Sequence, residues 1–358
     1  MNLIVSFLLL TTFVFAKKFT LPILEKTQNL ANSRVPVYDY LEAEYLVTLS
    51  IGTPPQKFRV LVDNSSPITW VPGSDCVYDG KEDVTKKKFS SKNSSTYQPE
   101  YDFFGHNTTL GKVAGKLATD TVTLGEGENS LTLEDIEFGI ASVLGIKYNN
   151  YALDGVLGLG RQPNSFIQRA INASLLDEPL VSIHFKDEGF DKTGKLGGAL
   201  TLGGVDNANC GIVSNWVDME HEFEWIFNVS SINLDGFHLK GGLAQSNTGI
   251  GFVFGPFEWI YSWARGLGAD YATNRDIWIS GCEIDFLMQF TIGKQNYTVS
   301  PKNLIQYMGP HQWCQLQVKS TDFLAPYQWI LGAPFVQGYC HVYDFENGRL
   351  GFAPLIKI

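Results

Sequence analysis

The chain of 358 residues is poor in charge and in cysteine. Only 18% of its residues are charged, and 27 basic residues stand against 37 acidic ones, which gives a net charge of -10. The one lysine cluster, Lys86-Lys87-Lys88, is too small a basic patch to indicate nucleic-acid binding. The five cysteines form no C-x-x-C pair, so neither a zinc site nor a redox motif is indicated. We therefore expect no nucleic-acid partner, no metal and no cofactor.

Motifs of several enzyme classes are missing as well. The sequence contains no G-x-S-x-G, no Walker A motif and no dinucleotide-binding fingerprint. The six histidines show neither H-E-x-x-H nor triad spacing, so we interpret all of them as structural or surface residues.

Long hydrophobic runs are absent after the first sixteen residues. Residues 3–15 are almost all apolar, and Val14 and Ala16 match the small-residue pattern that precedes signal-peptide cleavage. The basic start of a signal peptide is missing, but a membrane anchor, the alternative, needs roughly 20 apolar residues. We predict a signal peptide at 1–16, then a short basic propeptide-like segment at 17–34 that is removed or disordered. The mature protein is expected to be secreted and to have no membrane span.

Two further features fit export. Five cysteines in an oxidising compartment predict two disulfides and one remaining thiol. N-x-S/T sequons are more frequent than a cytosolic chain needs, at Asn64, Asn93, Asn107, Asn172, Asn228 and Asn296.

The pattern of apolar residues predicts strands. Alternating residues in EYLVTLSIG and KFRVLVD flank a turn at Thr53-Pro54-Pro55, and similar short strands separated by turn residues continue along the chain. Helical periodicity is confined to residues 164–176, 257–267 and 302–308. We therefore predict an all-β fold with a few short helices.

A repeat divides the chain in two. The polar loop Asp63-Asn64-Ser65-Ser66 precedes the segment DGVLGLG (Asp154–Gly160), and the loop Asn247-Thr248-Gly249 precedes WILGAPF (Trp329–Phe335) at a similar distance. Such a duplication predicts two β-rich lobes with both polar loops in the cleft between them.

These segments resemble the pepsin family of aspartic proteases over nearly the whole mature chain. The matching stretches occur in the family's order: VYDYLEAEYLVTLSIGTPPQKFRVLVD, ITWVPGSDC, DGVLGLG, GGALTLGGVD and WILGAPFVQGYCHVYDFENGRLGFAP. The resemblance implies two six-stranded β lobes, here at 35–211 and 212–358, that meet at a central sheet. A peptide-binding cleft covered by a hairpin flap is expected between them.

Catalysis in the family uses two aspartates that share one proton, one from each D-T/S-G loop. Asp63 matches the first, but Asn247 stands where the second belongs. Because asparagine does not ionise, it cannot act as acid and base in turn. We expect its amide to donate to Asp63 and to lower the pKa of that carboxyl.

Other positions depart from the family pattern. Asn64 replaces a threonine whose hydroxyl ties the two loops together, and Ser65 replaces a glycine. The flap tyrosine is replaced by Phe104 or Thr108, depending on where an insertion is placed, and Ala333 replaces another aspartate. We expect these changes together to leave a degenerate site, with Asn247→Asp alone unable to restore appreciable activity. The residues expected to contact a bound peptide are Ser66, Phe104, Thr108, Thr248 and Gly249.

The resemblance also implies covalent features. Cys282 and Cys314 match the bridge of the family's C-terminal lobe, whereas the usual partner of Cys76 is absent. Cys210 and Cys340 fall on segments of the central sheet, and we hypothesise that they pair. The sequon at Asn64 lies in the buried loop and is expected to be unglycosylated, while glycosylation is expected at Asn93, Asn107, Asn172 and Asn296.

We interpret the chain as a secreted, monomeric, catalytically inactive homologue whose cleft binds a peptide or a partner protein. One alternative is a weakly active acid endopeptidase that depends on Asp63. Another is a structural or storage glycoprotein for which the cleft has no role.

Overall fold

We describe a computed structural model of the chain. It describes residues 18–26, 44–78, 81–82, 86–108, 110–127, 129–186, 195–273, 276–308, 313–320 and 328–356. The predicted signal peptide at 1–16, residue 17 and residues 27–34 lie outside these ranges. Within the described ranges, we find no helix with both the length and the apolar character needed to cross a bilayer.

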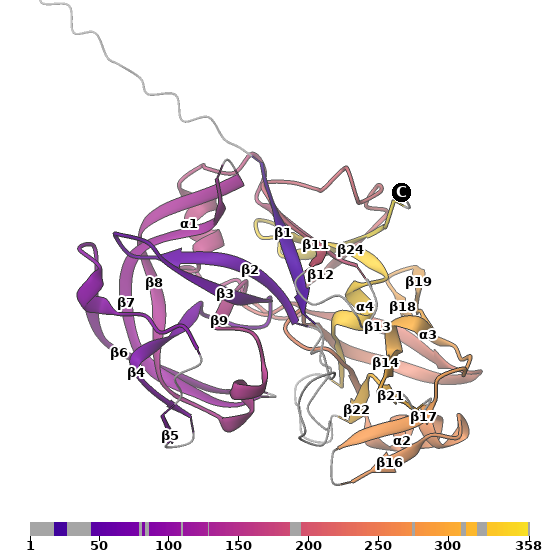
Figure 1. The fold of residues 1–358 in the computed structure, drawn as a ribbon. Helices are drawn as coiled ribbons and strands as arrows, with labels where there is room; N and C mark the ends of the chain where they lie inside the picture. Colours follow the sequence, from indigo (N-terminus) through magenta and orange to yellow (C-terminus); the bar gives the residue numbers. More distant parts are fainter. Residues whose placement is uncertain are drawn as a thin grey trace, which may run out of the picture.

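Strands make up most of the chain, which confirms the all-β prediction (Figure 1). The helices are short: α1 (Phe166–Asn172), α2 (Phe257–Gly266), α3 (Pro301–Leu304) and α4 (Ala333–Val336), with 3-10 turns at Ser91–Asn93 and Ile146–Asn150. The helices expected within 164–176 and 257–267 are confirmed. The helix expected over 302–308 is wrong beyond Leu304, because the chain continues there as strand β20 (Ile305–Tyr307), which pairs with β21 (Trp313–Leu316).

The largest sheet has 14 strands and extends from the N-terminal half of the chain into its C-terminal end. The alternation of side chains expected of a strand is clear in β7, where every second residue from 118 to 124 is buried: Ala118, Asp120, Val122 and Leu124. The strands are β1 (Phe19–Lys26), β2 (Glu44–Ile51), β3 (Gln56–Asp63), β4 (Trp70–Tyr78), β5 (Lys81–Glu82), β6 (Gln98–Thr108), β7 (Gly111–Glu126), β8 (Asn129–Leu144), β9 (Gly155–Gly158), β10 (Leu180–Phe185), β11 (Lys195–Leu202), β12 (Asn215–Asp218), β24 (Tyr339–Asp344) and β25 (Arg349–Pro354).

Two smaller sheets lie in the C-terminal half, drawn from salmon-pink to orange in Figure 1. A seven-stranded sheet contains β13 (Ile226–Leu234), β14 (Phe237–Ser246), β15 (Val253–Gly255), β18 (Met288–Ile292), β19 (Gln295–Val299), β22 (Val318–Ser320) and β23 (Trp329–Leu331). A four-stranded sheet contains β16 (Asp270–Ala272), β17 (Ile277–Gly281), β20 (Ile305–Tyr307) and β21 (Trp313–Leu316).

The sequence repeat corresponds to a repeated strand pairing. β3 ends at Asp63 and pairs in parallel with β9, which carries the DGVLGLG segment. β14 ends at Ser246, one residue before Asn247, and pairs in parallel with β23 of the WILGAPF segment. Glycine is required in both segments, because a Cβ on Gly158 or Gly332 would lie within 2.6 Å of a backbone oxygen of the neighbouring loop. The two polar loops are therefore held by equivalent frameworks.

Residues Phe19–Lys26 are part of the sheet, so this part of the segment that we expected to be removed or disordered is ordered in the structure, and its removal stays a prediction. β1 lies between β11 and β2 and is antiparallel to both. It completes the run β12-β25-β24-β10-β11-β1, which joins the C-terminal strands to those of the N-terminal half. Residues of both halves also contribute to one continuous hydrophobic core.

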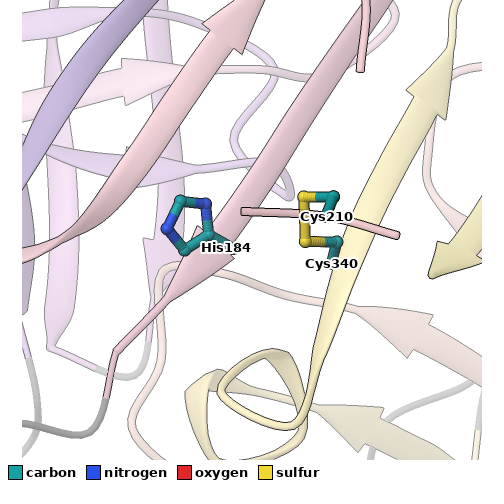
Figure 2. Close-up of side chains that lie close together, drawn as sticks. All are labelled: His184, Cys210 and Cys340. Carbon is teal, nitrogen blue, oxygen red and sulfur yellow. A yellow bond between two sulfur atoms is a disulfide. The ribbon is translucent and has the colours of Figure 1, made fainter. Parts of the chain in front are cut away.

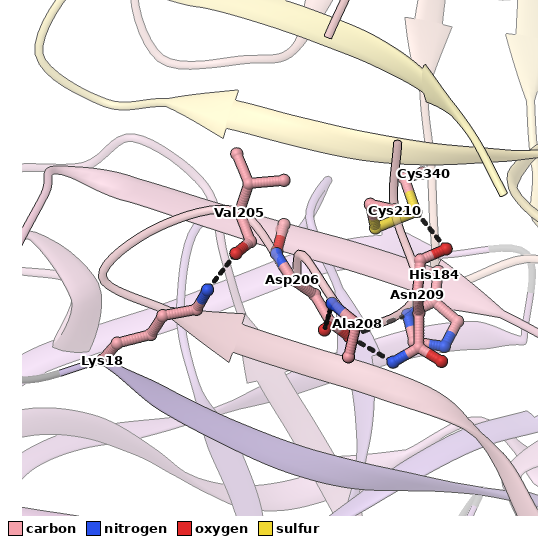
Figure 3. The surroundings of a disulfide bond; sticks show 9 residues. Lys18, His184, Val205, Asp206, Ala208, Asn209, Cys210 and Cys340 are labelled. Carbon is pink, nitrogen blue, oxygen red and sulfur yellow. Dashed lines mark hydrogen bonds and ion pairs between the residues drawn. A yellow bond between two sulfur atoms is a disulfide. The ribbon is translucent and has the colours of Figure 1, made fainter. Parts of the chain in front are cut away.

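A disulfide fastens this central run of strands. Cys340 on β24 is bonded to Cys210, which forms an isolated bridge with Leu355, so the hypothesised pairing is present (Figure 2). Asp206, one turn before Cys210, accepts hydrogen bonds from Ala208 and Asn209 (Figure 3). The structure also contains the Cys282–Cys314 disulfide that the resemblance implies.

The two disulfides close loops of different length, with sequence separations of 130 and 32 residues. We predict that replacing both Cys210 and Cys340 with alanine lowers the free energy of unfolding by about 2–5 kcal/mol. The Cys282→Ala/Cys314→Ala variant serves as the matched control and is expected to lose less, because its loop is shorter. Guanidinium unfolding followed by tryptophan fluorescence measures both losses. An equal or larger loss in the control would contradict the prediction.

Candidate active site

A cavity of about 540 Å³ lies between the two polar loops. The N-terminal half contributes Asp63, Ser65, Ser66, Trp70, His106, Thr108 and Tyr148 to its lining, and the C-terminal half contributes Glu224, Gln245, Asn247, Gly249 and Phe254. A cavity of this size, with mostly apolar walls and a few converging polar groups, is typical of a ligand site.

Asp63 is held at the end of β3 by its own loop. Its Oδ1 accepts hydrogen bonds from the backbone N–H of Ser65 (2.8 Å), the hydroxyl of Ser65 (2.7 Å) and the backbone N–H of Ser66 (3.2 Å). Its carboxyl group packs against Gly249 of the other loop, where a Cβ would lie 2.4 Å from Asp63 Cγ. Gly249 is therefore needed for the close approach of the two loops.

Asn247 occupies the equivalent position in the second loop. Its Oδ1 accepts from the backbone N–H of Gly249 (3.0 Å), just as Asp63 Oδ1 accepts from Ser65. Its Nδ2 donates to Gln245 Oε1 (3.3 Å). The expectation that this amide donates to Asp63 is wrong, because its acceptor is Gln245 on the preceding strand.

The expected lowering of the Asp63 pKa is wrong for a related reason. Burial raises the pKa of Asp63 above its ordinary value, although the hydrogen bonds from Ser65 and Ser66 and the nearby His106 oppose the shift. With the Asn247 amide directed to Gln245, no second-loop donor offsets the cost of burying the charge.

The two loops are clamped together by Asn64 and Thr248, both fully buried. Thr248 Oγ1 accepts from the Asn64 backbone N–H (3.0 Å) and donates to the Val62 carbonyl (2.8 Å). In return, Asn64 Oδ1 accepts from the Thr248 backbone N–H (2.7 Å). Asn64 therefore keeps the tie that the resemblance assigns to a threonine, so its replacement is not a defect of the framework.

The carboxamide of Asn64 also reaches further than a threonine hydroxyl can. Its Nδ2 donates to Ser246 Oγ (3.2 Å) and to the hydroxyl of Tyr343 (3.1 Å) on β24. The neighbouring His341 is fully buried, and burial lowers its pKa to about 3, so its ring is neutral. This buried network connects both loops to the central sheet.

The flap is the hairpin of β6 and β7. Thr108 lines the cavity near its tip, and its hydroxyl is 2.8 Å from the hydroxyl of Tyr148. Phe104 does not line the cavity, because its ring fills the space above Gly139. Tyr148 brings a phenol into the cleft, and burial raises its pKa to about 12. It packs edge-on against Trp70, whose indole N–H is buried without a hydrogen-bond partner.

His106 is one of the cavity-lining residues that the sequence analysis did not identify. It lies on β6, and no motif distinguishes it from the histidines that we interpreted as structural or surface residues. Burial lowers the pKa of His106, although the charge of Asp63 opposes the shift. The alternation of side chains along β6 is the one sequence signal that could have indicated that the His106 side chain faces the cavity.

The other expected contact residues divide into two groups. Ser66 and Gly249 line the cavity, as expected. Thr248 does not, because its side chain is engaged in the clamp. Ala333 is buried at the start of α4, where its N–H donates to the Ile250 carbonyl (2.8 Å).

One group of three potential metal ligands occurs among the described residues. It consists of His184, Cys210 and Cys340 (Figure 2). The two sulfurs are bonded to each other, so they offer no thiolate to a metal. Nδ1 of His184 lies 3.5 Å from Asp206, and the group sits in the central sheet away from the cleft.

Residues 44–355 match the family described as "Eukaryotic aspartyl protease". The chain belongs to this family. It is 33% identical to Aspartic protease 6 of Caenorhabditis elegans over 92% of this chain and 86% of the relative. It is 30% identical to Aspartic protease 2 of Necator americanus (91% and 87% covered) and 29% identical to Cathepsin E of Aquarana catesbeiana (90% and 82% covered).

The contribution of the Asn64–Thr248 clamp to stability can be tested by mutation. We predict that Asn64→Ala lowers the free energy of unfolding by about 2–4 kcal/mol, because the buried N–H of Thr248 loses its acceptor. Asn64→Thr retains an acceptor and is expected to lose less. The control is Asn228→Ala at an exposed position, with a change within about 0.5 kcal/mol. Denaturant unfolding measures the free energy of unfolding of each variant. If Asn64→Ala lowers it no more than the control does, the clamp does not stabilise the fold.

The raised pKa of Asp63 predicts a pH-dependent effect on stability. Above the ordinary pKa of 3.8, the folded chain retains a proton that the unfolded chain releases, so Asp63 costs stability increasingly as pH rises. We predict that the stability of Asp63→Asn relative to wild type increases between pH 3 and pH 7. Unfolding titrations at several pH values measure this difference, with Asp75→Asn as an exposed charge-matched control. A difference that decreases with pH would show that the carboxylate is stabilised instead.

Proposed function

We propose that this member of the aspartyl protease family is a secreted, non-catalytic protein that binds peptides or a partner protein in its cleft. The observation that carries the proposal is Asn247, whose carboxamide occupies the second polar loop with both polar atoms engaged within that loop and its strand.

The chemistry of the family dyad requires two groups that exchange one proton. Asp63 retains a carboxyl whose pKa is raised, which suits a proton donor. The carboxamide of Asn247 neither releases nor accepts a proton in the relevant pH range. Because general acid–base catalysis contributes about 100- to 10,000-fold per group, its loss reduces hydrolysis to a negligible rate.

The cleft is nevertheless suited to holding a ligand. The clamp preserves the approach of the two loops, and the cavity has aromatic walls from Trp70, Tyr148 and Phe254. Aromatic walls give apolar contact area to an extended peptide, and the serines of the first loop add hydrogen-bonding groups. A single-chain monomer is sufficient for such a site.

Secretion and glycosylation are supported by three observations. The first sixteen residues have the composition of a signal peptide, and two disulfides join the described cysteines other than Cys76. The favoured sequons are all exposed, at Asn93, Asn107, Asn172 and Asn296. The amide of Asn64 donates to Ser246 and Tyr343 in the interior, which is incompatible with a glycan.

A second candidate is a weakly active endopeptidase at acid pH. The observation that favours it is His106, which lines the same cavity as Asp63 and could serve as the second proton-transferring group. In this candidate, both Asp63→Ala and His106→Ala abolish cleavage.

We predict that the purified chain cleaves unfolded casein no faster than Asp63→Ala at any pH from 2 to 7. We also predict that Asn247→Asp remains at least about 100-fold below an active family member assayed in parallel. The reason is that the flap residue Thr108, Ser65 and Ala333 remain altered. Gel and mass-spectrometric detection of fragments measures both rates. Wild-type cleavage that disappears in both Asp63→Ala and His106→Ala would favour the second candidate, and robust cleavage by Asn247→Asp would show that the other changes matter little.

A further inference from the structure

The cleft contains a second carboxylate that the sequence did not indicate. Glu224, half-buried between β12 and β13, lines the same cavity as Asp63 but from the C-terminal half. Of the other titratable side chains in the lining, Tyr148 is neutral because its pKa is raised to about 12, and burial lowers the pKa of His106. The described lining of the cavity therefore has acidic side chains on both sides and contains no lysine or arginine.

The carboxylate of Glu224 is held in a defined direction. Gln245 Nε2 donates to Glu224 Oε2 (3.0 Å), and Gln245 Oε1 accepts from Asn247 (3.3 Å). Gln245 is buried on β14, so this chain of hydrogen bonds connects Glu224 rigidly to the second polar loop.

The backbone beside Glu224 is fixed as well. The next residue, Trp225, is fully buried, its indole N–H donates to the Leu159 carbonyl (3.1 Å), and its own carbonyl accepts from Ser246. Within the described residues, Glu224 forms no ion pair, and Oε1 accepts no hydrogen bond. One oxygen is thus used for orientation, and the other is open to a ligand.

We infer that Glu224 makes the cleft selective for a peptide with a lysine or arginine side chain at one position. The inference rests on the proposed function, since it names the chemistry of the ligand for that same cleft. A carboxylate that is held in place and partly removed from water forms a stronger hydrogen-bonded pair with a cation than an exposed one does. The net charge of -10 also favours the approach of a basic segment.

The test uses fluorescein-labelled nine-residue peptides of alanine, valine and phenylalanine. A single lysine is moved through the sequence, and norleucine replaces it in the matched set. We expect lysine at one position to bind about tenfold more tightly than norleucine in fluorescence anisotropy at pH 7. This preference should disappear in Glu224→Gln, and Glu224→Lys should prefer glutamate at the same position. The control is Glu222→Gln, an exposed carboxylate two residues away, which should retain the lysine preference.

The outcomes separate the inference from the function on which it rests. Peptide binding without a lysine preference, or a preference that persists in Glu224→Gln, would overturn the inference and leave the binding function intact. Failure of every peptide to bind a folded wild-type sample would overturn both the inference and the proposed binding of peptides in the cleft. Circular dichroism and a thermal melt establish that each variant is folded.

Discussion

The reciprocal hydrogen bonds between Asn64 and Thr248 are the interaction on which the cleft depends. They join the loops that follow β3 and β14, although Asn64 and Thr248 are 184 residues apart in the sequence. Each residue receives the backbone N–H of the other, so neither loop can move without exposing a buried polar group. Asn64 extends the network to Ser246 and Tyr343, so the loops are also fixed to the central sheet.

The clamp lies beside Asp63 and Asn247 in the sequence. It holds the two loops together through Asn64 and Thr248, so the geometry of the site does not depend on a charge at both Asp63 and Asn247. Asp63 and Asn247 each accept from the N–H two residues later, so a neutral carboxamide fits the position as well as a carboxylate. The fold can therefore keep the shape of a protease cleft under the proposed function, in which no proton-sharing pair is needed. The shape persists because backbone donors hold it, whereas catalysis needs a second group that titrates.

The β-rich fold, the repeat and the meeting of the two polar loops at one cavity could be predicted from the sequence, because they depend on local motifs with fixed spacing. Prediction from the sequence failed where the outcome depends on side chains distant in the chain. The amide of Asn247 turns to Gln245, and Gln245 in turn is held by Glu224, a residue that carries no motif. His106 was missed because its place in the cavity depends on how the β6–β7 hairpin folds over the cleft. The tie made by Asn64 was misjudged because a carboxamide can accept and donate in place of a hydroxyl.

The proposed function requires that the cleft binds peptides and leaves them intact. Mass spectrometry of a defined peptide mixture recovered from the purified chain, after prolonged incubation between pH 3 and pH 7, measures both properties. We expect intact peptides to be recovered from the protein and their yield to fall when Asn64→Ala loosens the clamp. Peptide fragments that accumulate with wild type and are absent with Asp63→Ala would contradict the proposed function.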